Sequence, residues 1–221
     1  MSRSYRSRNC ASPPICPRRQ PERGGSGYDL LVQSLAGNDI ENSPIEAEGL
    51  YFLYHGSYLL DRHFAIRAVQ ITREDDSVLA VSDSINDNLS GKGIIEAHGC
   101  LVFFGTPARP HIVTDGSDNR HGLNLFIGTS MIPQIGKMRQ VVGTMIGMTD
   151  RAQHFYRHAI IVRAPADTTL DQMMSQTGIY RLTALKDERK FDPAHARAIE
   201  ELARQIQLNS QCFSDPILGL P

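Results

Sequence analysis

The chain has 221 residues, of which 41% are hydrophobic and 21% charged, with four cysteines and no tryptophan. This composition fits one folded domain with room for a tail, and it is too apolar for a chain that is disordered throughout. The formal net charge of −1 gives the chain as a whole no electrostatic reason to bind nucleic acid or a membrane surface. No apolar run approaches the roughly 20 residues that span a bilayer, which excludes a transmembrane helix.

The charge is unevenly distributed along the chain. Residues 1–25 hold six arginines against Glu22 alone, which makes this stretch +5 and the rest of the chain −6. Residues 1–27 also lack apolar periodicity and are rich in Ser, Pro and Gly, so we interpret them as a disordered basic leader. A transit peptide or an arm for phosphate groups is the alternative, so nucleic acid is expected only through this leader. Residues 28–47 follow as a short helix and a linker.

The cysteines indicate the cellular compartment. Cys10, Cys16, Cys100 and Cys212 show neither the spacing of a disulfide framework nor a C-x2-C zinc half-site. The N-terminal arginines are not followed by the apolar stretch of a secretory signal. The sequence therefore predicts a reducing compartment and a cytoplasmic location.

Residues 48–164 are dominated by short strand patterns rich in β-branched and aromatic residues. The expected strands lie at residues 50–55, 64–72, 78–81, 94–98, 101–105, 123–127, 138–148 and 155–162. Residues 98–99 are expected to form a hairpin turn, and residues 106–121 a polar loop. About eight strands without helices between them predict a mainly β (α+β) fold, an antiparallel meander that forms a barrel or a sandwich.

Residues 165–221 return to helical patterns, and we expect a C-terminal segment of two helices packed on the sheet. Thr168 and Asp171 have the spacing of a capping box for the first helix. Asp192 followed by Pro193 predicts the start of the second helix. The apolar face of this second helix comprises Ala198, Ile199, Leu202 and Ile206. Plugging a barrel end and self-association are the alternatives to packing on the sheet.

Six sequence segments follow one another in an order that is typical of one known domain. They are GLYF at 49–52, the arginine-containing strand at 66–74, GIIEAHG at 93–99 leading into LVFFG at 101–105, VGTMIG at 142–147 and AIIVR at 159–163. In this order, residues 48–164 resemble the β-rich sensory domain that follows a helix-turn-helix in some bacterial transcriptional regulators. The resemblance implies a sensory function. Because residues 1–47 leave room for only one short helix, it implies a stand-alone or truncated sensor without direct sequence-specific DNA binding.

Three short motifs contain residue types found in metal and phosphate sites. His154 and His158 are four residues apart, but they lie on a predicted strand, without a third ligand or the glutamate of a metalloprotease motif. Residues 90–93 (SGKG) are too short for a P-loop, and residues 115–119 lack the acidic spacing of a calcium loop. We therefore expect no metal site.

Polar side chains that interrupt the apolar strands are the candidates for a binding site. They are Arg67, Glu96, His98, Gln140, Arg157 and His158, and all but Gln140 are predicted to bind a ligand. Arg67 is the only charge on the strand face that it shares with Ala65, Val69 and Ile71. If this face lies inside a barrel, the guanidinium needs an anionic partner or ligand.

These patterns predict a non-catalytic intracellular regulatory or sensory domain that binds a small ligand in its barrel, without a cofactor. The first alternative is a protein-interaction or structural domain, with a homodimer formed through the helix at 192–207 or a sheet edge. The second alternative is an enzyme of unknown class. Its catalytic groups would be His98 with Cys100, which share a strand face, or the His154 and His158 pair. The apolar neighbours of Cys100 favour an inert thiol.

Overall fold

A computed structural model describes most of the chain between Glu46 and Cys212. The described residues are 46–57, 60, 62–73, 79–89, 91, 93–104, 109–116, 124–134, 136–148 and 154–212. The predicted leader at 1–27 lies outside them, as does nearly all of the predicted helix and linker at 28–47.

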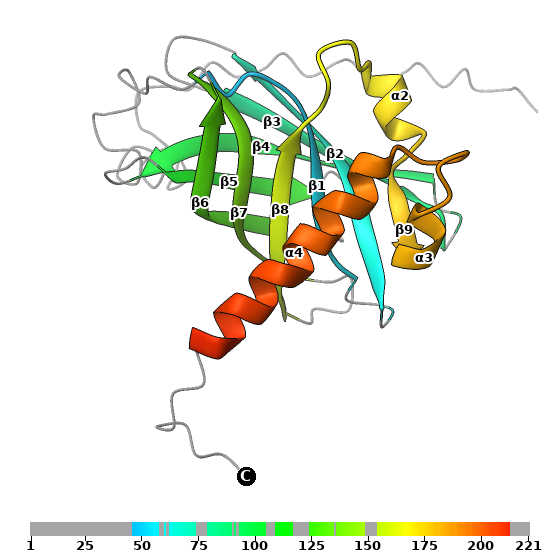
Figure 1. The fold of residues 1–221 in the computed structure, drawn as a ribbon. Helices are drawn as coiled ribbons and strands as arrows, with labels where there is room; N and C mark the ends of the chain where they lie inside the picture. The colour runs from blue at the N-terminus through cyan, green and yellow to red at the C-terminus, as the bar shows by residue number, and fades with distance from the viewer. Residues whose placement is uncertain are drawn as a thin grey trace, which may run out of the picture.

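Eight antiparallel strands form a closed barrel (Figure 1). The strands are β1 Gly49–Gly56, β2 His63–Arg73, β3 Leu79–Asp87, β4 Gly93–Phe104, β5 Arg109–Gly116, β6 Asn124–Gln134, β7 Lys137–Met148 and β8 His154–Arg163. Each strand pairs with the next along the chain, and β1 also pairs with β8, which closes the barrel. The prediction of a mainly antiparallel β fold is confirmed, and of the two predicted forms the chain adopts the barrel.

Two local predictions are wrong, and they cancel in the strand count. β4 runs unbroken through residues 98–99, where a turn was expected, and the expected loop at 106–121 contains β5. Gly99 explains the first error. A Cβ added there would lie 1.7 Å from the carbonyl oxygen of Val113 on β5. The glycine therefore permits a close approach of two strands and does not end a strand.

Replacing Gly99 with alanine is expected to lower the free energy of unfolding by about 1–3 kcal/mol, because the backbone of β5 must move to admit the methyl group. Gly56→Ala is the matched control, since the nearest atom to a Cβ added at Gly56 lies 3.8 Å away. The control is expected to change stability by less than about 0.5 kcal/mol. Urea unfolding followed by circular dichroism measures both changes. Equal stabilities for the two variants would contradict the close approach.

Alternate residues of the strands face two separate cores. The core inside the barrel includes Tyr51, Leu53, Val69, Ile71, Val81, Leu101, Phe103, Ile112, Phe126, Val141, Met145, Phe155 and Ile161. The second core lies between the outer barrel wall and the C-terminal segment, and includes Phe52, Tyr54, Ile66, Ala68, Val142, Ile160, Met173, Leu185, Ala198, Ile199 and Leu202. β1, β2 and β8 are therefore buried on both faces, which explains why β1 is apolar at nearly every position.

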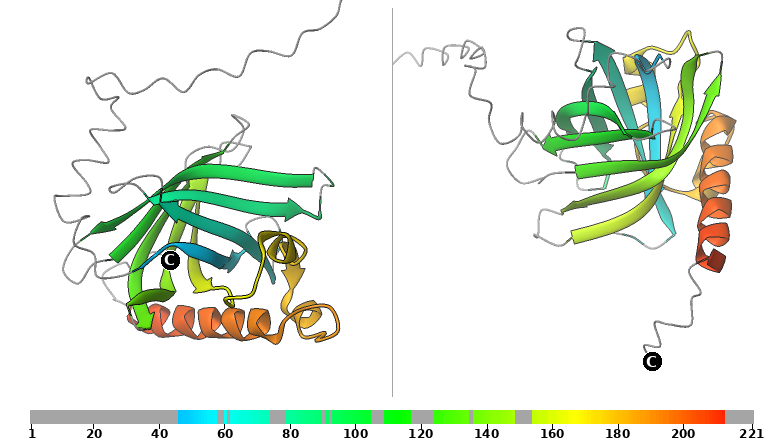
Figure 2. Two further views of the ribbon diagram at one scale, coloured as in Figure 1. Left: turned by 90° about the horizontal axis from the view of Figure 1, so that it is seen from above. Right: turned by 90° about the vertical axis from the view of Figure 1, so that its left-hand side faces the viewer.

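The C-terminal segment lies along the side of the barrel. Its elements are α2 Leu170–Met174, β9 Gly178–Arg181, α3 Leu182–Leu185 and α4 Pro193–Cys212. The long helix α4 crosses the outer faces of β8 and β1 (Figures 1 and 2). It runs along the side of the barrel and not across one of its ends. The expected number of two helices is not confirmed, because residues 165–212 already contain three helices and an additional strand.

The two predicted helix starts had different outcomes. The capping box of α2 is formed by Thr169 and Gln172, one residue later than predicted. The start of α4 is confirmed, because the Asp192 carboxylate accepts a hydrogen bond of 2.8 Å from the backbone N–H of Ala194.

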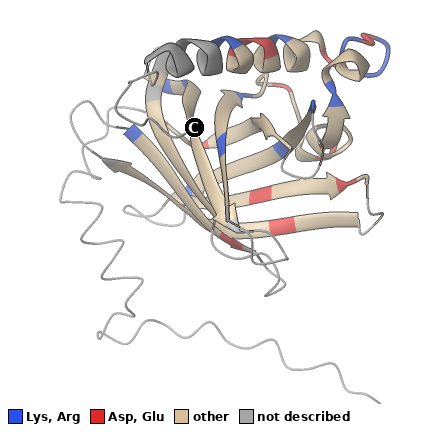
Figure 3. Ribbon diagram, turned by 90° about the horizontal axis from the view of Figure 1, so that it is seen from below, with Lys and Arg blue, Asp and Glu red and all other residues tan. Residues whose placement is uncertain are grey.

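The apolar face of α4 packs on the outer wall of the barrel. Ala198, Ile199 and Leu202 are all buried against it. Charged residues lie on the remainder of α4 and on the connection before it, whereas the barrel strands are mostly uncharged (Figure 3). These three apolar side chains are thus already covered within the chain, and they leave no apolar seam for a second copy at these positions.

A buried chain of hydrogen bonds also ties α4 to the barrel. The His195 Nε2–H donates to the amide oxygen of Gln176, so Nδ1 is left as the acceptor and lies 2.9 Å from the donating hydroxyl of Tyr54 on β1. Burial lowers the pKa of His195 to about 4, against a smaller opposing effect of Asp192. The imidazole is therefore neutral at pH 7 and works as a two-sided connector between helix and barrel.

Candidate functional site

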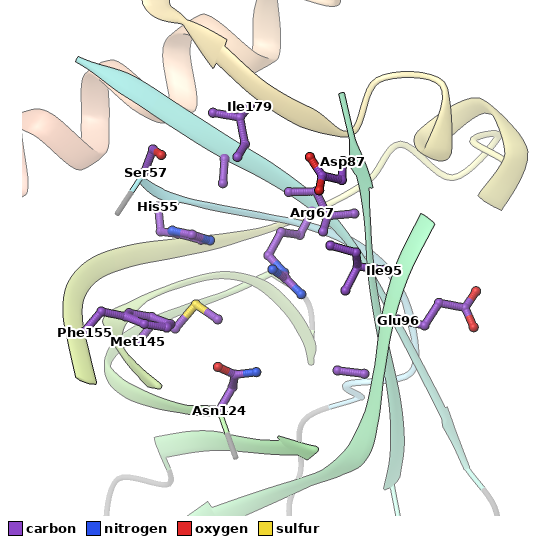
Figure 4. Close-up of a pocket in the computed structure, with 13 residues that line it drawn as sticks. His55, Ser57, Arg67, Asp87, Ile95, Glu96, Asn124, Met145, Phe155 and Ile179 are labelled. Atoms are coloured by element: carbon purple, nitrogen blue, oxygen red, sulfur yellow. The ribbon is translucent and has the colours of Figure 1, made fainter. Parts of the chain in front are cut away.

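A cavity of about 70 Å³ lies inside one end of the barrel. Its lining residues come from the end of β1, the start of β2, the end of β3, the starts of β4, β6 and β8, and the end of β7, which antiparallel pairing brings to one mouth (Figure 4). The side chains are His55, Ser57, Ala65, Arg67, Ile85, Asp87, Ile95, Glu96, Ala97, Asn124, Met145, Phe155 and Ile179. Mostly apolar walls with a few polar groups are typical of small-molecule sites.

Strand β9 forms part of the barrel wall beside this cavity. The pairing of β2 with β3 ends at Ala68 and Ser84, and residues 63–66 of β2 pair with β9 instead. On the other side, the backbone N–H groups of Asn86 and Ile179 bond to the Thr177 hydroxyl and the Asn88 side chain, at 3.0 and 2.8 Å. The segment around β9 therefore lies between β2 and β3, and Ile179 adds a side chain of the C-terminal segment to the cavity.

Arg67 lies inside the barrel and has a carboxylate partner there. Its Nε donates to both oxygens of Asp83, at 2.7 and 3.0 Å, and the side chains of Arg67 and Asp83 are only 12% and 4% exposed. The register explains the contact, because Val69 on β2 is opposite Asp83 on β3, one inward-facing position from Arg67. The partner that Arg67 requires is thus supplied by the chain itself.

His55 is the most unusual residue of the cavity. It is 1% exposed, and its Nδ1 lies 3.0 Å from the carbonyl oxygen of Gly56. A carbonyl only accepts hydrogen bonds, so Nδ1 of the neutral ring carries the proton and Nε2 has a free lone pair. Among the described residues, Nε2 of His55 is the one buried side-chain nitrogen or oxygen atom without a hydrogen-bond partner.

The electrostatic surroundings keep His55 neutral. Burial, and to a lesser extent the positive charges of Arg67 and Arg157, lower its pKa to about 4, against the favourable effect of the Gly56 carbonyl. The ring is therefore neutral at pH 7, and its Nε2 can only accept a proton or a hydrogen bond.

The other predicted site residues divide between the two faces of the wall. Arg157 is half-buried on the inward-facing row of β8 between Phe155 and Ala159, and its Nη1 donates to the Tyr156 carbonyl at 2.8 Å. Glu96 and His98 are on the outer face of β4, 52% and 60% exposed. Although Glu96 borders the cavity, its carboxylate points away from it (Figure 4).

The outward-facing row of β7 and β8 includes two more of the predicted residues. His158 is opposite Thr144, and Gln140 is opposite Val162, which packs against the outer core. The structure therefore brings Arg67 and Arg157 toward one mouth and leaves Glu96, His98, His158 and Gln140 on the outer side of the wall.

Sequence reasoning missed the polar residues that complete the cavity. Asn124 belongs to a short apolar run, and His55 to the end of the first strand. Asp83, the buried partner of Arg67, was not among the candidate residues either. Alternation along β1 could have identified His55, because Tyr51 and Leu53 precede it on the same face.

The opposite end of the barrel is closed by its own side chains. The Tyr51 hydroxyl donates to the Ala47 carbonyl at 2.7 Å, and Arg163 donates to the same hydroxyl at 3.1 Å and to the Glu48 carbonyl at 2.6 Å. Burial raises the pKa of Tyr51 to about 12, although the neighbouring Arg163 acts in the opposite direction. These hydrogen bonds hold the polar side chains in place at the end of the barrel that lies opposite His55.

The motifs that were considered for metal, phosphate and catalytic sites lie only partly within the described residues. No group of three His, Cys, Asp or Glu side chains that could hold a metal ion occurs among the described residues. Cys100 is buried, whereas His98 on the same strand is largely exposed. Ser90, Lys92 and residues 117–119 of the other two motifs lie outside the described part of the chain. No helix in the described residues is both long and apolar enough to cross a membrane.

Comparison with known proteins gives no family. No protein-family model matches the chain, and no curated protein matches it either. The case for a function therefore depends on the geometry of the barrel and its cavity.

Proposed function

We propose that this chain is a non-catalytic binding domain that holds a small molecule in the mouth of its barrel. The proposal rests on one observation, the environment of the His55 side chain. Its fully buried Nε2 points into the cavity and has no hydrogen-bond partner among the described residues. An unsatisfied buried nitrogen costs free energy, and a bound ligand with a hydrogen-bond donor would recover it.

The setting that we propose for this binding is regulatory and cytoplasmic. It is supported by the resemblance of residues 48–164 to sensory domains of bacterial regulators and by the cysteine usage. β9 supports it as well, because a ligand in contact with Ile179 would touch the same segment that continues into α3 and α4.

A thermal-shift screen of small acids, alcohols, amides and apolar compounds tests the proposal. At a ligand concentration of about 100 times Kd, binding adds about 2.7 kcal/mol to stability, so we expect at least one compound to raise the melting temperature. Ala97→Leu fills the cavity and is expected to abolish that increase. Ala80→Leu, which adds the same side chain on the outward-facing row of β3, is the matched control.

Two outcomes would contradict the proposal. One is a panel in which no compound stabilises the wild-type chain. The other is a compound that stabilises the Ala97→Leu and Ala80→Leu variants equally, because its site would then lie outside the barrel.

A further inference from the structure

Within the described residues, the cavity presents a buried hydrogen-bond acceptor without a partner, Nε2 of His55. Nε2 of His55 cannot donate, because the proton of the neutral ring is on Nδ1 and is directed at the Gly56 carbonyl. Figure 4 shows the imidazole ring directed from β1 into the cavity, on the same side as Met145 and Phe155. A ligand that satisfies this atom must bring an O–H or N–H group.

The cavity also presents hydrogen-bond donors. Both contacts of Arg67 to Asp83 use Nε, and within the described residues Nη1 and Nη2 make no hydrogen bond. Figure 4 shows the guanidinium group extending into the space between His55 and Asn124. The Nη1 and Nη2 edge of the guanidinium can therefore bind a carboxylate, whose two oxygen atoms match its two parallel N–H donors.

Acceptor and donors are close to each other in the barrel wall. His55 is opposite Ala65, and Arg67 is the next residue on the same face of β2, so the two side chains form a diagonal cross-strand pair. Side chains in such pairs start roughly 7–8 Å apart and are within reach of one small molecule. The ligand must then carry its acid and its donor on the same or adjacent carbon atoms.

The size of the cavity limits the ligand further. A water molecule needs roughly 10–15 Å³ of such space, so a volume of about 70 Å³ admits on the order of five to seven non-hydrogen atoms. Much of the surrounding wall is apolar and is formed by Ile85, Ile95, Met145 and Phe155, which favours a short ligand over one with a long polar tail.

We propose that the barrel mouth binds a small hydroxy acid, whose carboxylate contacts Arg67 and whose hydroxyl group donates to Nε2 of His55. This inference depends on the proposed function, since it names the ligand class of the same cavity.

Other ligand classes leave part of this site unsatisfied. A cation is disfavoured by Arg67 and Arg157, whose charges act at His55. An apolar compound would leave both Nε2 and the Arg67 fork without partners. A dianion such as inorganic phosphate would have to compete with Asp83, which already accepts from Arg67, and with the nearby Asp87. A monoanion with one donor group satisfies both polar sites at once.

Three compounds that differ by one group each provide the test: glycolate, acetate and ethylene glycol. Affinities are measured by NMR titration of the full-length chain with ¹⁵N-labelled histidine. Glycolate is expected to bind about tenfold more tightly than acetate, which is the effect of one added hydrogen bond. The ¹⁵N resonance of His55 Nε2 is expected to shift on saturation with glycolate and to stay in place with acetate.

Variants assign each half of the ligand to its partner. His55→Phe is expected to lower the affinity for glycolate to that for acetate, without changing the affinity for acetate. The double variant Arg67→Met with Asp83→Leu removes the ion pair as a unit and is expected to weaken both acids by at least about tenfold. His98→Ala, a change of an exposed histidine on the outer face, is the control and is expected to leave all affinities unchanged.

The results separate this inference from the function on which it depends. Equal affinities for glycolate and acetate, or a Nε2 resonance that stays in place at saturation, would overturn the hydroxy-acid assignment. If another compound of the screening panel binds and Ala97→Leu blocks it, the binding function stands and only the ligand class is wrong. If no compound binds inside the barrel, both proposals fail.

Discussion

Replacing Asp83 with leucine is expected to lower the free energy of unfolding by about 3–5 kcal/mol, because it leaves the Arg67 guanidinium buried without its carboxylate. Both partners are almost fully enclosed by the barrel, with side chains 12% and 4% exposed, so the guanidinium loses its charged partner in a buried setting. Urea unfolding at pH 7 measures the change. The loss should appear as a lower midpoint at an unchanged slope with denaturant concentration.

A second variant separates the charge from the packing. The double variant Arg67→Met with Asp83→Leu replaces the ion pair by apolar side chains, and it is expected to recover most of the lost stability. Glu48→Gln is the surface control, because the Arg73–Glu48 pair is 49% and 37% exposed. The Glu48→Gln substitution is expected to lower the free energy of unfolding by less than about 1 kcal/mol. An Asp83→Leu variant no less stable than Glu48→Gln would mean that the guanidinium reaches solvent.

Acid is expected to destabilise the protein through two buried histidines. The pKa values of His55 and His195 are both lowered from 6.5 to about 4, mainly by burial. Between about pH 6.5 and pH 4, the unfolded chain binds two protons that the folded chain does not, so the free energy of unfolding falls as the pH is lowered. The expected slope is about 3 kcal/mol per pH unit for the pair, with full stability from these groups above about pH 6.5 and a plateau below about pH 4.

Urea unfolding at half-unit intervals between pH 7 and pH 4 measures this dependence. His55→Phe and His195→Leu should each reduce the slope by about 1.4 kcal/mol per pH unit, whatever their effect on stability at pH 7. His98→Ala, which removes an exposed histidine, should leave the slope as in the wild-type chain. Slopes that are the same in all four proteins would show that neither buried ring stays neutral in acid.

The sequence was sufficient to predict most local features of the fold. The β-branched and aromatic runs identified six of the eight strands as separate elements, and Asp192 with Pro193 identified the start of α4. These features depend on residues that are neighbours in the chain, which is why they could be predicted. The misplaced turn at Gly99 shows the limit of that approach. The glycine is required by its close approach to the Val113 carbonyl, a contact that exists only because β4 pairs with β5.

The candidate site could be predicted only in part for the same reason. Arg67 stood out because it is the only charge in an apolar row, and it does lie in the cavity. Glu96 and His98 also interrupt an apolar strand, but they belong to the row of β4 that faces outward. Alternation sorts the residues of a strand into two rows, one on each face of the sheet. It does not say which row faces the barrel interior, because part of the outer face is also buried, under the C-terminal segment.

By itself, then, the sequence determined a chain of antiparallel strands, a C-terminal helix with an apolar face, and one charged residue in an apolar row. The tertiary structure decided the rest: the closure of β1 on both β2 and β8, the insertion of β9 beside β2, the pairing of Arg67 with Asp83, and the buried His55 nitrogen for which the described part of the chain offers no partner. Each of these depends on register between distant segments. Register is fixed by the burial of whole faces and not by the residues of any one strand.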